Sequence, residues 1–130
     1  MFSRIRYNLF LSNEASINKD IISSNNIEVI MNVARDAKDF YIADIHVACV
    51  FDDDYESAKG MAPKAARMLI HLLRNNYVVL VHCKGGHSRS SHVVALALSV
   101  LEDKNYEKAY REVRRLHTIA LPLEMSRLFR

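Results

Sequence analysis

The residues best suited to chemistry lie in one short segment, 79–91, where an apolar run ends at His82 and a second apolar stretch begins at Ser90. The first run is typical of a buried strand and the second of a buried helix. Between them, Gly85 and Gly86 permit backbone conformations closed to other residues, so successive amides can turn toward one tetrahedral anion. The helix that follows adds its N-terminal dipole and unpaired N–H groups. The segment therefore predicts an anion-binding loop.

A nucleophile and a cationic clamp flank this loop. Cys83 stands at its start, where the same electrostatic field favours the thiolate over the thiol. Arg89 follows six positions later and can curl back to grip two oxygens of the anion with its planar guanidinium, a geometry that lysine cannot reproduce. The pair predicts attack by sulfur on a bound phosphate, with Arg89 holding the equatorial oxygens in the transition state.

Carboxylates follow another predicted strand. Asp52, Asp53 and Asp54 come directly after the apolar run 45–51. Because ligand sites of parallel sheets gather at the carboxyl ends of the strands, these carboxylates are expected beside the loop. The alternative for the three together is a solvated turn.

The elements that must position these residues follow from periodicity. Alternating residues predict a partly exposed strand from Ile5 to Leu11, and apolar runs predict buried strands at 27–33, 45–51 and 77–82. Helical spacing predicts helices at 13–23, 61–73 (with Pro63 in its first turn), 90–101 and 106–116. This alternation predicts an α/β fold, a mostly parallel central sheet flanked by helices on both faces.

Composition limits the class of protein. With 130 residues, of which 50% are hydrophobic and 25% charged, the chain fits one globular domain. The net charge of +3 suits an anionic substrate but is too small to imply nucleic acid by itself. The N-terminal segment interrupts its apolar residues with arginines, and apolar stretches such as 93–98 are too short to span a bilayer. We expect a cytoplasmic protein without a membrane span, small enough to enter the nucleus, with its two cysteines reduced.

The loop carries a family signature. His82 and Cys83, then five residues, then Arg89 and Ser90 resemble the His-Cys-x5-Arg-Ser/Thr signature of protein tyrosine phosphatases. The form Cys-x-x-Gly-x-Ser-Arg-Ser, typical of small dual-specificity members, is matched at Gly86, Ser88 and Ser90. The resemblance extends to the segments 7–11, 27–33 and 109–113 and weakens after His117, where the usual Pro-Asn and Gln-Leu landmarks are missing.

The resemblance implies a dual-specificity phosphatase catalytic domain over residues 1–130, with a protein tyrosine phosphatase-like fold. It implies hydrolysis of phosphotyrosine and of phosphoserine or phosphothreonine in proteins, through a phosphocysteine intermediate, with no metal and no cofactor. Asp52 matches the family's spacing of the general acid best, with Asp53 next. By resemblance, the Ser90 hydroxyl helps the sulfur to leave and His82 orients the loop. The phosphate is expected on Lys84, Gly85, Gly86, His87, Ser88 and Arg89.

Other functions remain open on the same residues. An RNA 5′-phosphatase or phosphoinositide phosphatase is one, although such enzymes more often have Arg-Thr-Gly where this chain has Arg89, Ser90 and Ser91. A non-catalytic phosphoprotein-binding module is another, although such modules commonly lose the cysteine, the arginine or the aspartate. Contact of the basic C-terminal region with RNA or phosphoinositides is not favoured, because no aromatic platform interleaves its charges: Arg111, Arg114, Arg115, Arg127 and Arg130.

Two further alternatives concern the cysteines. Zinc bound through His82, Cys83, His87 and His92 would lack the paired spacing of a tetrahedral site. Cys49 lies in a predicted buried strand, where packing is its default role. A reversible disulfide between Cys49 and an oxidised Cys83 is a second hypothesis for it. The oligomeric state is not indicated by the sequence.

Overall fold

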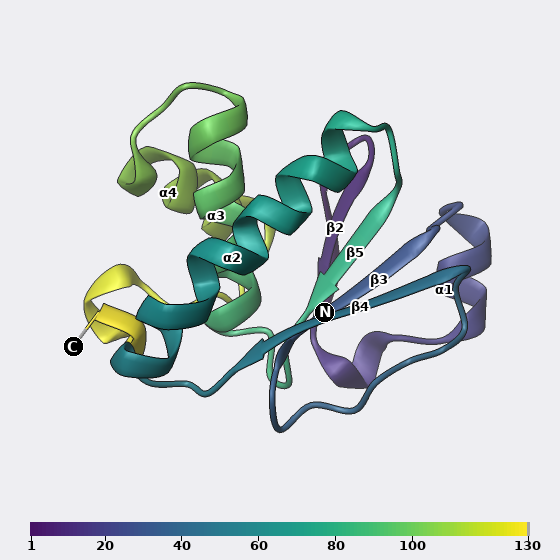
Figure 1. The fold of residues 1–130 in the computed structure, drawn as a ribbon, viewed down its shortest axis with the longest axis horizontal. Coiled ribbons are helices and arrows are strands. Elements are labelled where there is room, and N and C mark those ends of the chain that lie inside the picture. Colours follow the sequence, from purple (N-terminus) through teal and green to yellow (C-terminus); the bar gives the residue numbers. More distant parts are fainter. Residues whose placement is uncertain (130) are drawn as a thin grey trace.

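A five-stranded sheet with the order β1-β2-β5-β3-β4 forms the centre of the molecule (Figure 1). The computed structural model describes residues 1–129, so Arg130 of the basic C-terminal set lies outside the described residues. The pairs β2·β5, β5·β3 and β3·β4 are parallel, whereas β1 runs antiparallel to β2. The strands are β1 (Phe2–Arg6), β2 (Leu9–Ser12), β3 (Val29–Ala34), β4 (Ile45–Phe51) and β5 (Val79–His82). The predicted α/β fold with a mostly parallel sheet is confirmed.

Helices cover both faces of this sheet. Figure 1 shows α1 on one side and α2, α3 and α4 on the other. Their bounds are α1 (Lys19–Ser24), α2 (Tyr55–Arg74), α3 (Arg89–Leu101) and α4 (Tyr106–Leu116), with 3-10 turns at Glu14–Ser16, Leu123–Met125 and Arg127–Phe129. Within residues 1–129, no helix has both the length and the apolar character needed to cross a membrane.

Alternate side chains of the central strands enter two separate cores. In β5, Val79 and Val81 pack with the larger core beneath α2 and α3. Leu80, between them, packs with Phe10 and Ile22 in the smaller core beneath α1. Because successive side chains of a strand point to opposite faces, a strand covered on both faces must be apolar throughout. This requirement explains why the central strands are visible in the sequence as predominantly apolar runs.

Two predictions of element bounds in the N-terminal region are wrong. The segment from Ile5 to Leu11 is not one strand but a hairpin, β1 and β2, that turns at Tyr7 and Asn8. Its alternating pattern continues through the turn, so periodicity could not reveal the reversal. The predicted helix at 13–23 is a 3-10 turn followed by α1, which begins only after Asn18, whose side chain accepts a hydrogen bond from the Ile21 amide.

The start of α2 was also misplaced. Pro63 was expected in the first helical turn, but it lies inside the helix, which begins at Tyr55. The true start is set by Asp54, whose carboxylate accepts a hydrogen bond from the amide of Ser57 at 2.8 Å. An interior proline removes one backbone hydrogen bond, and α2 tolerates this loss because its other face packs against the core.

A charged network joins β1 to α3 and α4 away from the loop. Arg6 lies 2.7 Å from Glu102 and 2.9 Å from Glu112, and Lys104 lies 2.8 Å from each carboxylate. The hydrogen bond from Arg6, helped by Lys104, lowers the pKa of Glu102 to about 2 against the opposing effect of burial. The depressed pKa means that folding favours the ionised form of Glu102.

We expect Glu102→Gln to lower the free energy of unfolding at pH 7 by about 1 kcal/mol, a small value because the carboxylate is partly solvated. A lowered folded-state pKa gives stability that is present above the ordinary value of 4.5 and lost as the pH falls through about 2. Urea titrations of both proteins between pH 7 and pH 2 should therefore converge at the acid end. Glu107→Gln, in an exposed pair with Arg111, is the control, and a loss equal to that of Glu102→Gln would contradict the prediction.

Candidate active site

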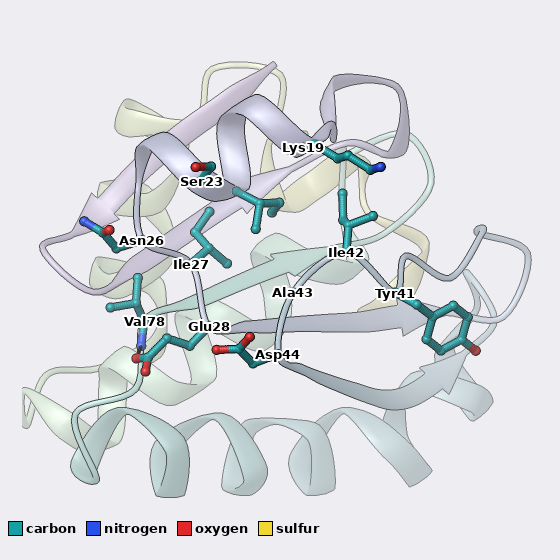
Figure 2. A pocket seen from close by; sticks show the side chains of 11 residues that line it. Lys19, Ser23, Asn26, Ile27, Glu28, Tyr41, Ile42, Ala43, Asp44 and Val78 are labelled. Atoms are coloured by element: carbon teal, nitrogen blue, oxygen red, sulfur yellow. Dashed lines mark hydrogen bonds between the residues drawn. The ribbon is translucent and has the colours of Figure 1, made fainter.

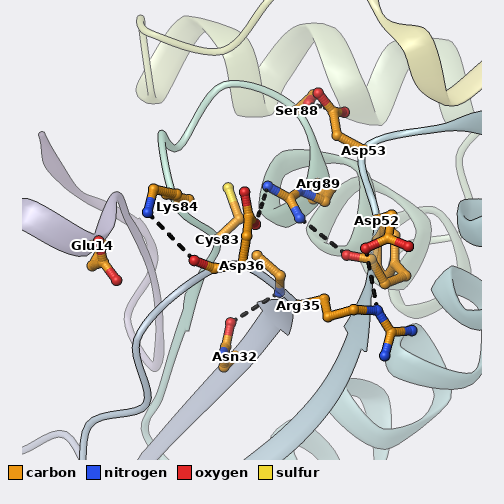
Figure 3. Close-up of polar contacts among 12 residues, drawn as sticks. Glu14, Asn32, Arg35, Asp36, Asp52, Asp53, Cys83, Lys84, Ser88 and Arg89 are labelled. Carbon is orange, nitrogen blue, oxygen red and sulfur yellow. Dashed lines mark hydrogen bonds and ion pairs between the residues drawn. The ribbon is translucent and has the colours of Figure 1, made fainter.

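Three strand ends meet around Cys83 (Figure 3). Cys83 follows β5 directly, Arg35 and Asp36 follow β3, and the aspartates 52–54 follow β4. Ser88 and Arg89, at the far end of the loop, contact residues at the ends of β3 and β4. The structure thus brings together the two segments in which the sequence placed reactive residues.

The carbonyl groups of the loop are held from outside. Lys84 O accepts a hydrogen bond from Glu14 N at 3.0 Å, Gly86 O from His117 Nε2 at 3.1 Å, and His87 O from Leu121 N at 2.8 Å. The peptide bonds among the described residues are trans, and a trans peptide directs its N–H opposite to its C=O. The following amides, those of Gly85, His87 and Ser88, are therefore directed into the loop. This arrangement is a cradle of donors for an oxyanion.

Gly86 is required at its position in the loop. Its φ of +75° lies in the left-handed region, and a Cβ there would lie 2.9 Å from Ile119 Cδ1 and 3.1 Å from Asn13 Cβ. A residue with a side chain would be both strained and crowded. The signature glycine therefore allows the turn that directs the next amides inward.

The Cys83 side chain lies at the base of the loop. It is 2% exposed, and its Sγ atom lies 3.1 Å from the hydroxyl oxygen of Ser90 in the first turn of α3. A hydroxyl at this distance can donate a hydrogen bond to a thiolate. This contact gives Ser90 the position that its expected role requires.

His82 supports the start of the loop. Its Nδ1 lies 3.1 Å from the Cys83 carbonyl oxygen, which can only accept, so Nδ1 carries a proton. Burial lowers the pKa of His82 against the opposing effect of that hydrogen bond, which favours the neutral ring. The ring also meets Phe40 edge to face at 5.4 Å. His82 therefore contacts the backbone of the nucleophile rather than its sulfur.

Arg89 is held by two acceptors. Its side chain is 8% exposed, and its terminal nitrogens lie 3.0 Å from Phe51 O and 2.8 Å from Asp36 Oδ1 (Figure 3). Burial alone would raise the pKa of Asp36, but the hydrogen bond and charge of Arg89 outweigh it and hold that pKa below its usual value. The guanidinium is thus oriented before a ligand arrives. Sequence reasoning missed Asp36, although its place after a parallel strand is a signal like that of 52–54.

The three consecutive aspartates have different partners. Asp52, which spacing favours as the acid, lies 3.2 Å from Arg35 on the rim. Asp53 Oδ1 accepts a hydrogen bond at 3.0 Å from the hydroxyl of Ser88 in the loop. Asp54 caps α2. Two candidates for the acid therefore remain, and the structure places Asp53 in contact with the loop.

The side chains of Lys84 and His87 lie on the rim. Lys84 Nζ is 3.4 Å from the backbone oxygen of Asp36, and His87 Nδ1 is 2.9 Å from Ile119 O. Each contributes its backbone to the loop while its side chain contacts a neighbouring segment. They can shape the approach of an anion without touching the phosphate.

The structure argues against a direct disulfide between Cys49 and Cys83. Cys49 lies on β4, and β3 separates that strand from β5. Two strand spacings amount to about 10 Å, whereas a disulfide needs Cα atoms within about 7 Å. Burial raises the pKa of the Cys49 thiol, as expected for a packing residue.

The zinc alternative is not supported by the contacts of its proposed ligands. His92 Nδ1 lies 2.7 Å from the hydroxyl of Tyr106, and His87 contacts Ile119. Among residues 1–129, no group of three or more histidine, cysteine, aspartate or glutamate side chains is placed to hold a metal ion.

A cavity of about 820 Å³ lies away from this site, between α1 and the segment 41–44 (Figure 2). Its lining includes Ile22, Ile27 and Ile42 together with Lys19, Glu28 and Asp44. It contains no cysteine or histidine. The candidate reactive residues around Cys83 do not line this cavity.

Comparisons with known proteins agree with this geometry. The family described as dual specificity phosphatase, catalytic domain, matches residues 9–124. Protein phosphatase Slingshot homolog 3 of Homo sapiens is 33% identical over 123 residues, which are 92% of this chain and 19% of that protein. The chain therefore spans about a fifth of that relative's length.

Solved structures share the fold at lower identity. The crystal structure of human DUSP28 is 22% identical, with a TM-score of 0.78, over 94% of this chain and 84% of that one. The crystal structure of DUSP15 is 18% identical, with a TM-score of 0.81, over 93% of this chain and 79% of that one. A third structure is that of the human tyrosine phosphatase-like serine/threonine/tyrosine-interacting protein. It is 21% identical, with a TM-score of 0.77, over 93% of this chain and 87% of that one.

Proposed function

Because the chain belongs to the family of dual-specificity phosphatase catalytic domains, we propose that it hydrolyses phosphate monoesters of proteins, with Cys83 as the nucleophile. The observation that carries the proposal is the position of Cys83 Sγ, 3.1 Å from the Ser90 hydroxyl, at the base of a loop whose carbonyls are held outward. Arg89 lies at the other end of the same loop, already oriented by its two acceptors.

In the first step the Cys83 thiolate attacks phosphorus, so that a sulfur–phosphorus bond forms while the bond to the substrate oxygen breaks. An aspartic acid gives its proton to the leaving oxygen. The inward amides and the Arg89 guanidinium hold the equatorial oxygens, where charge develops. The products are the dephosphorylated side chain and a phosphocysteine.

In the second step water attacks the phosphocysteine, and the same aspartate, now a base, takes a proton from the water. The sulfur–phosphorus bond breaks, and inorganic phosphate and the thiolate form. The Ser90 hydroxyl donates to the departing sulfur and makes it a better leaving group. These steps require no metal or redox cofactor.

We propose both phosphotyrosine and phosphoserine or phosphothreonine in proteins as substrates, because the chain belongs to the dual-specificity family. Phosphate release should be measured from matched phosphotyrosine, phosphoserine and phosphothreonine peptides, from capped and triphosphorylated RNA, and from phosphoinositides. Release from the peptides supports the proposal. Release confined to RNA or lipid would assign the alternative substrates, and tight peptide binding without release would indicate a binding module.

We expect Asp53→Asn to reduce kcat/KM on a phosphotyrosine peptide by about 100-fold, and Asp52→Asn to have the smaller effect, because Asp53 contacts the loop. A general acid works only when protonated, so activity should fall as the pH rises above its pKa. Loss of the acid should therefore remove the alkaline limb of the pH profile. If Asp52→Asn instead showed the larger loss of activity and lacked the alkaline limb, the acid would be Asp52, in agreement with spacing. The 52–54 segment would then have to rearrange when substrate binds.

We also propose that the protein works in a reducing compartment such as the cytoplasm. Both cysteines are free, and oxidation of a thiolate nucleophile ends its reactivity.

A further inference from the structure

A histidine outside the family signature contacts the backbone of the phosphate loop, residues 83–89. His117 follows α4 directly and is fully buried, with 0% exposure. Its Nε2 lies 3.1 Å from Gly86 O, and its Nδ1 lies 2.7 Å from the hydroxyl of Ser3 in β1. The ring thus connects the edge strand of the sheet to the middle of the loop.

The chemistry of these partners fixes the protons on the ring. A carbonyl oxygen can only accept, so Nε2 must carry the proton that is donated to Gly86. Burial lowers the pKa of His117 more than the bond to Gly86 raises it, which favours a neutral ring with Nδ1 as an acceptor. The Ser3 hydroxyl therefore donates to Nδ1. Both ring nitrogens are hydrogen-bonded, which offsets the cost of burying them.

The peptide that His117 holds has a glycine on its N-terminal side. A flip of this peptide changes ψ of Gly86 and φ of His87, and Gly86, which has a φ of +75°, lacks the Cβ that would restrict such a rotation. If the peptide between Gly86 and His87 flipped, the Gly86 oxygen would face the anion and the His87 N–H would face away. The loop would then lose the His87 N–H as a donor to the anion, and the Gly86 carbonyl oxygen would repel the anion.

We propose that His117 is a positioning residue for the phosphate loop, fixing the 86–87 peptide so that the His87 amide is directed at the bound phosphate. The inference rests on the proposed function, because it concerns the same oxyanion. It assigns Ser3 a subordinate role, which is to keep the proton of His117 on Nε2. An apolar side chain would fill the same space without the desolvation of two nitrogens, so packing alone does not account for an imidazole here.

Tungstate binding tests the proposal without turnover. We expect His117→Leu to weaken tungstate binding about 10-fold or more and to raise KM by a similar factor, because the His87 amide, no longer held in place by His117, would be lost as a donor to the oxyanion. His117→Gln, whose side-chain amide can donate to Gly86, should bind tungstate within about threefold of wild type. Ser3→Ala, which leaves the tautomer free to change, should weaken binding about threefold.

His92→Leu is the matched control. It removes another buried imidazole, one that hydrogen-bonds to Tyr106 rather than to the loop. We expect it to lower the thermal midpoint while tungstate affinity stays unchanged. Calorimetric titration and a thermal melt on each variant separate loss of stability from loss of anion binding.

Equal tungstate affinity in wild type and His117→Leu, with only the thermal midpoint lowered, would overturn the proposal. Should His117→Leu fail to fold, unchanged tungstate affinity in Ser3→Ala would overturn it in the same way, and the expected weakening would support it. A wild-type protein that neither binds tungstate nor releases phosphate would instead contradict the proposed function, and this inference with it.

Discussion

Cys83→Ser is expected to abolish phosphate release, with a fall in kcat of about 10⁴-fold or more. A serine hydroxyl is a far weaker nucleophile than a thiolate, and this loop offers no general base within contact of the sulfur. The neighbouring hydroxyl of Ser90 lies 3.1 Å away and is suited to donate a proton rather than to remove one. Steady-state release of phosphate from para-nitrophenyl phosphate and from a phosphotyrosine peptide measures the effect.

Two measurements make the Cys83 result specific. Binding of the same phosphopeptide to Cys83→Ser should be retained, because the amides and Arg89 that hold the phosphate are unchanged. Cys49→Ser is the matched control, since Cys49 lies on β4, and it should keep full activity. Substantial turnover by Cys83→Ser would contradict the proposed mechanism at its first step.

The central strands could be predicted from the sequence because burial on both faces requires a predominantly apolar run. Such a run can be recognised within a single strand, without knowledge of its partners. The runs 27–33 and 77–82 correspond to β3 and β5. The predicted strand 45–51 coincides with β4, but its predicted burial is wrong, because β4 is an edge strand in which only Phe51 is fully buried. The hairpin at Tyr7 and Asn8 could not be predicted in the same way. Its two strands alternate in phase across the turn, and neither residue is the glycine that most strongly marks a two-residue turn.

Most of the site could be predicted only where it is local in sequence, and the aspartates 52–54 are the exception because they follow a strand that the sequence shows. The loop from Cys83 to Arg89 is contiguous, so spacing and residue type were sufficient to indicate an anion cradle. The residues that hold its carbonyls and its guanidinium come from elsewhere: Glu14, Asp36, His117 and Leu121. Their contacts arise from packing between distant elements, and for His117 no sequence signal exists.

The aspartates show a different limit. Sequence spacing shows how far each aspartate is from Cys83 along the chain. Catalysis depends instead on which carboxylate is oriented toward the loop. Asp52 and Asp53 are adjacent, yet one contacts Arg35 and the other contacts Ser88, because the chain turns at Asp53, where the Asp54 amide donates a hydrogen bond to Asp52 O at 2.9 Å. A preference based on spacing could not anticipate that division.

Arg89→Lys is expected to lower kcat/KM by about 10³-fold and to abolish measurable tungstate binding at concentrations that saturate wild type. In wild type, Phe51 O and Asp36 each accept from a terminal nitrogen of Arg89, which leaves its other N–H groups for the phosphate. A lysine ammonium has donors on a single nitrogen, so it cannot satisfy both acceptors and also bridge two phosphate oxygens.

The neighbouring carboxylate of Asp36 should make the loss of activity in Arg89→Lys larger than the loss of the planar guanidinium alone would cause. Asp36 would attract the mobile ammonium of a lysine and draw it toward the rim, away from the phosphate, whereas the planar guanidinium serves both sides at once. Arg111→Lys, on the exposed surface of α4, is the control and should leave kcat/KM unchanged. Retention of more than about a tenth of wild-type kcat/KM by Arg89→Lys would show that charge alone suffices, against the bidentate geometry argued for this clamp.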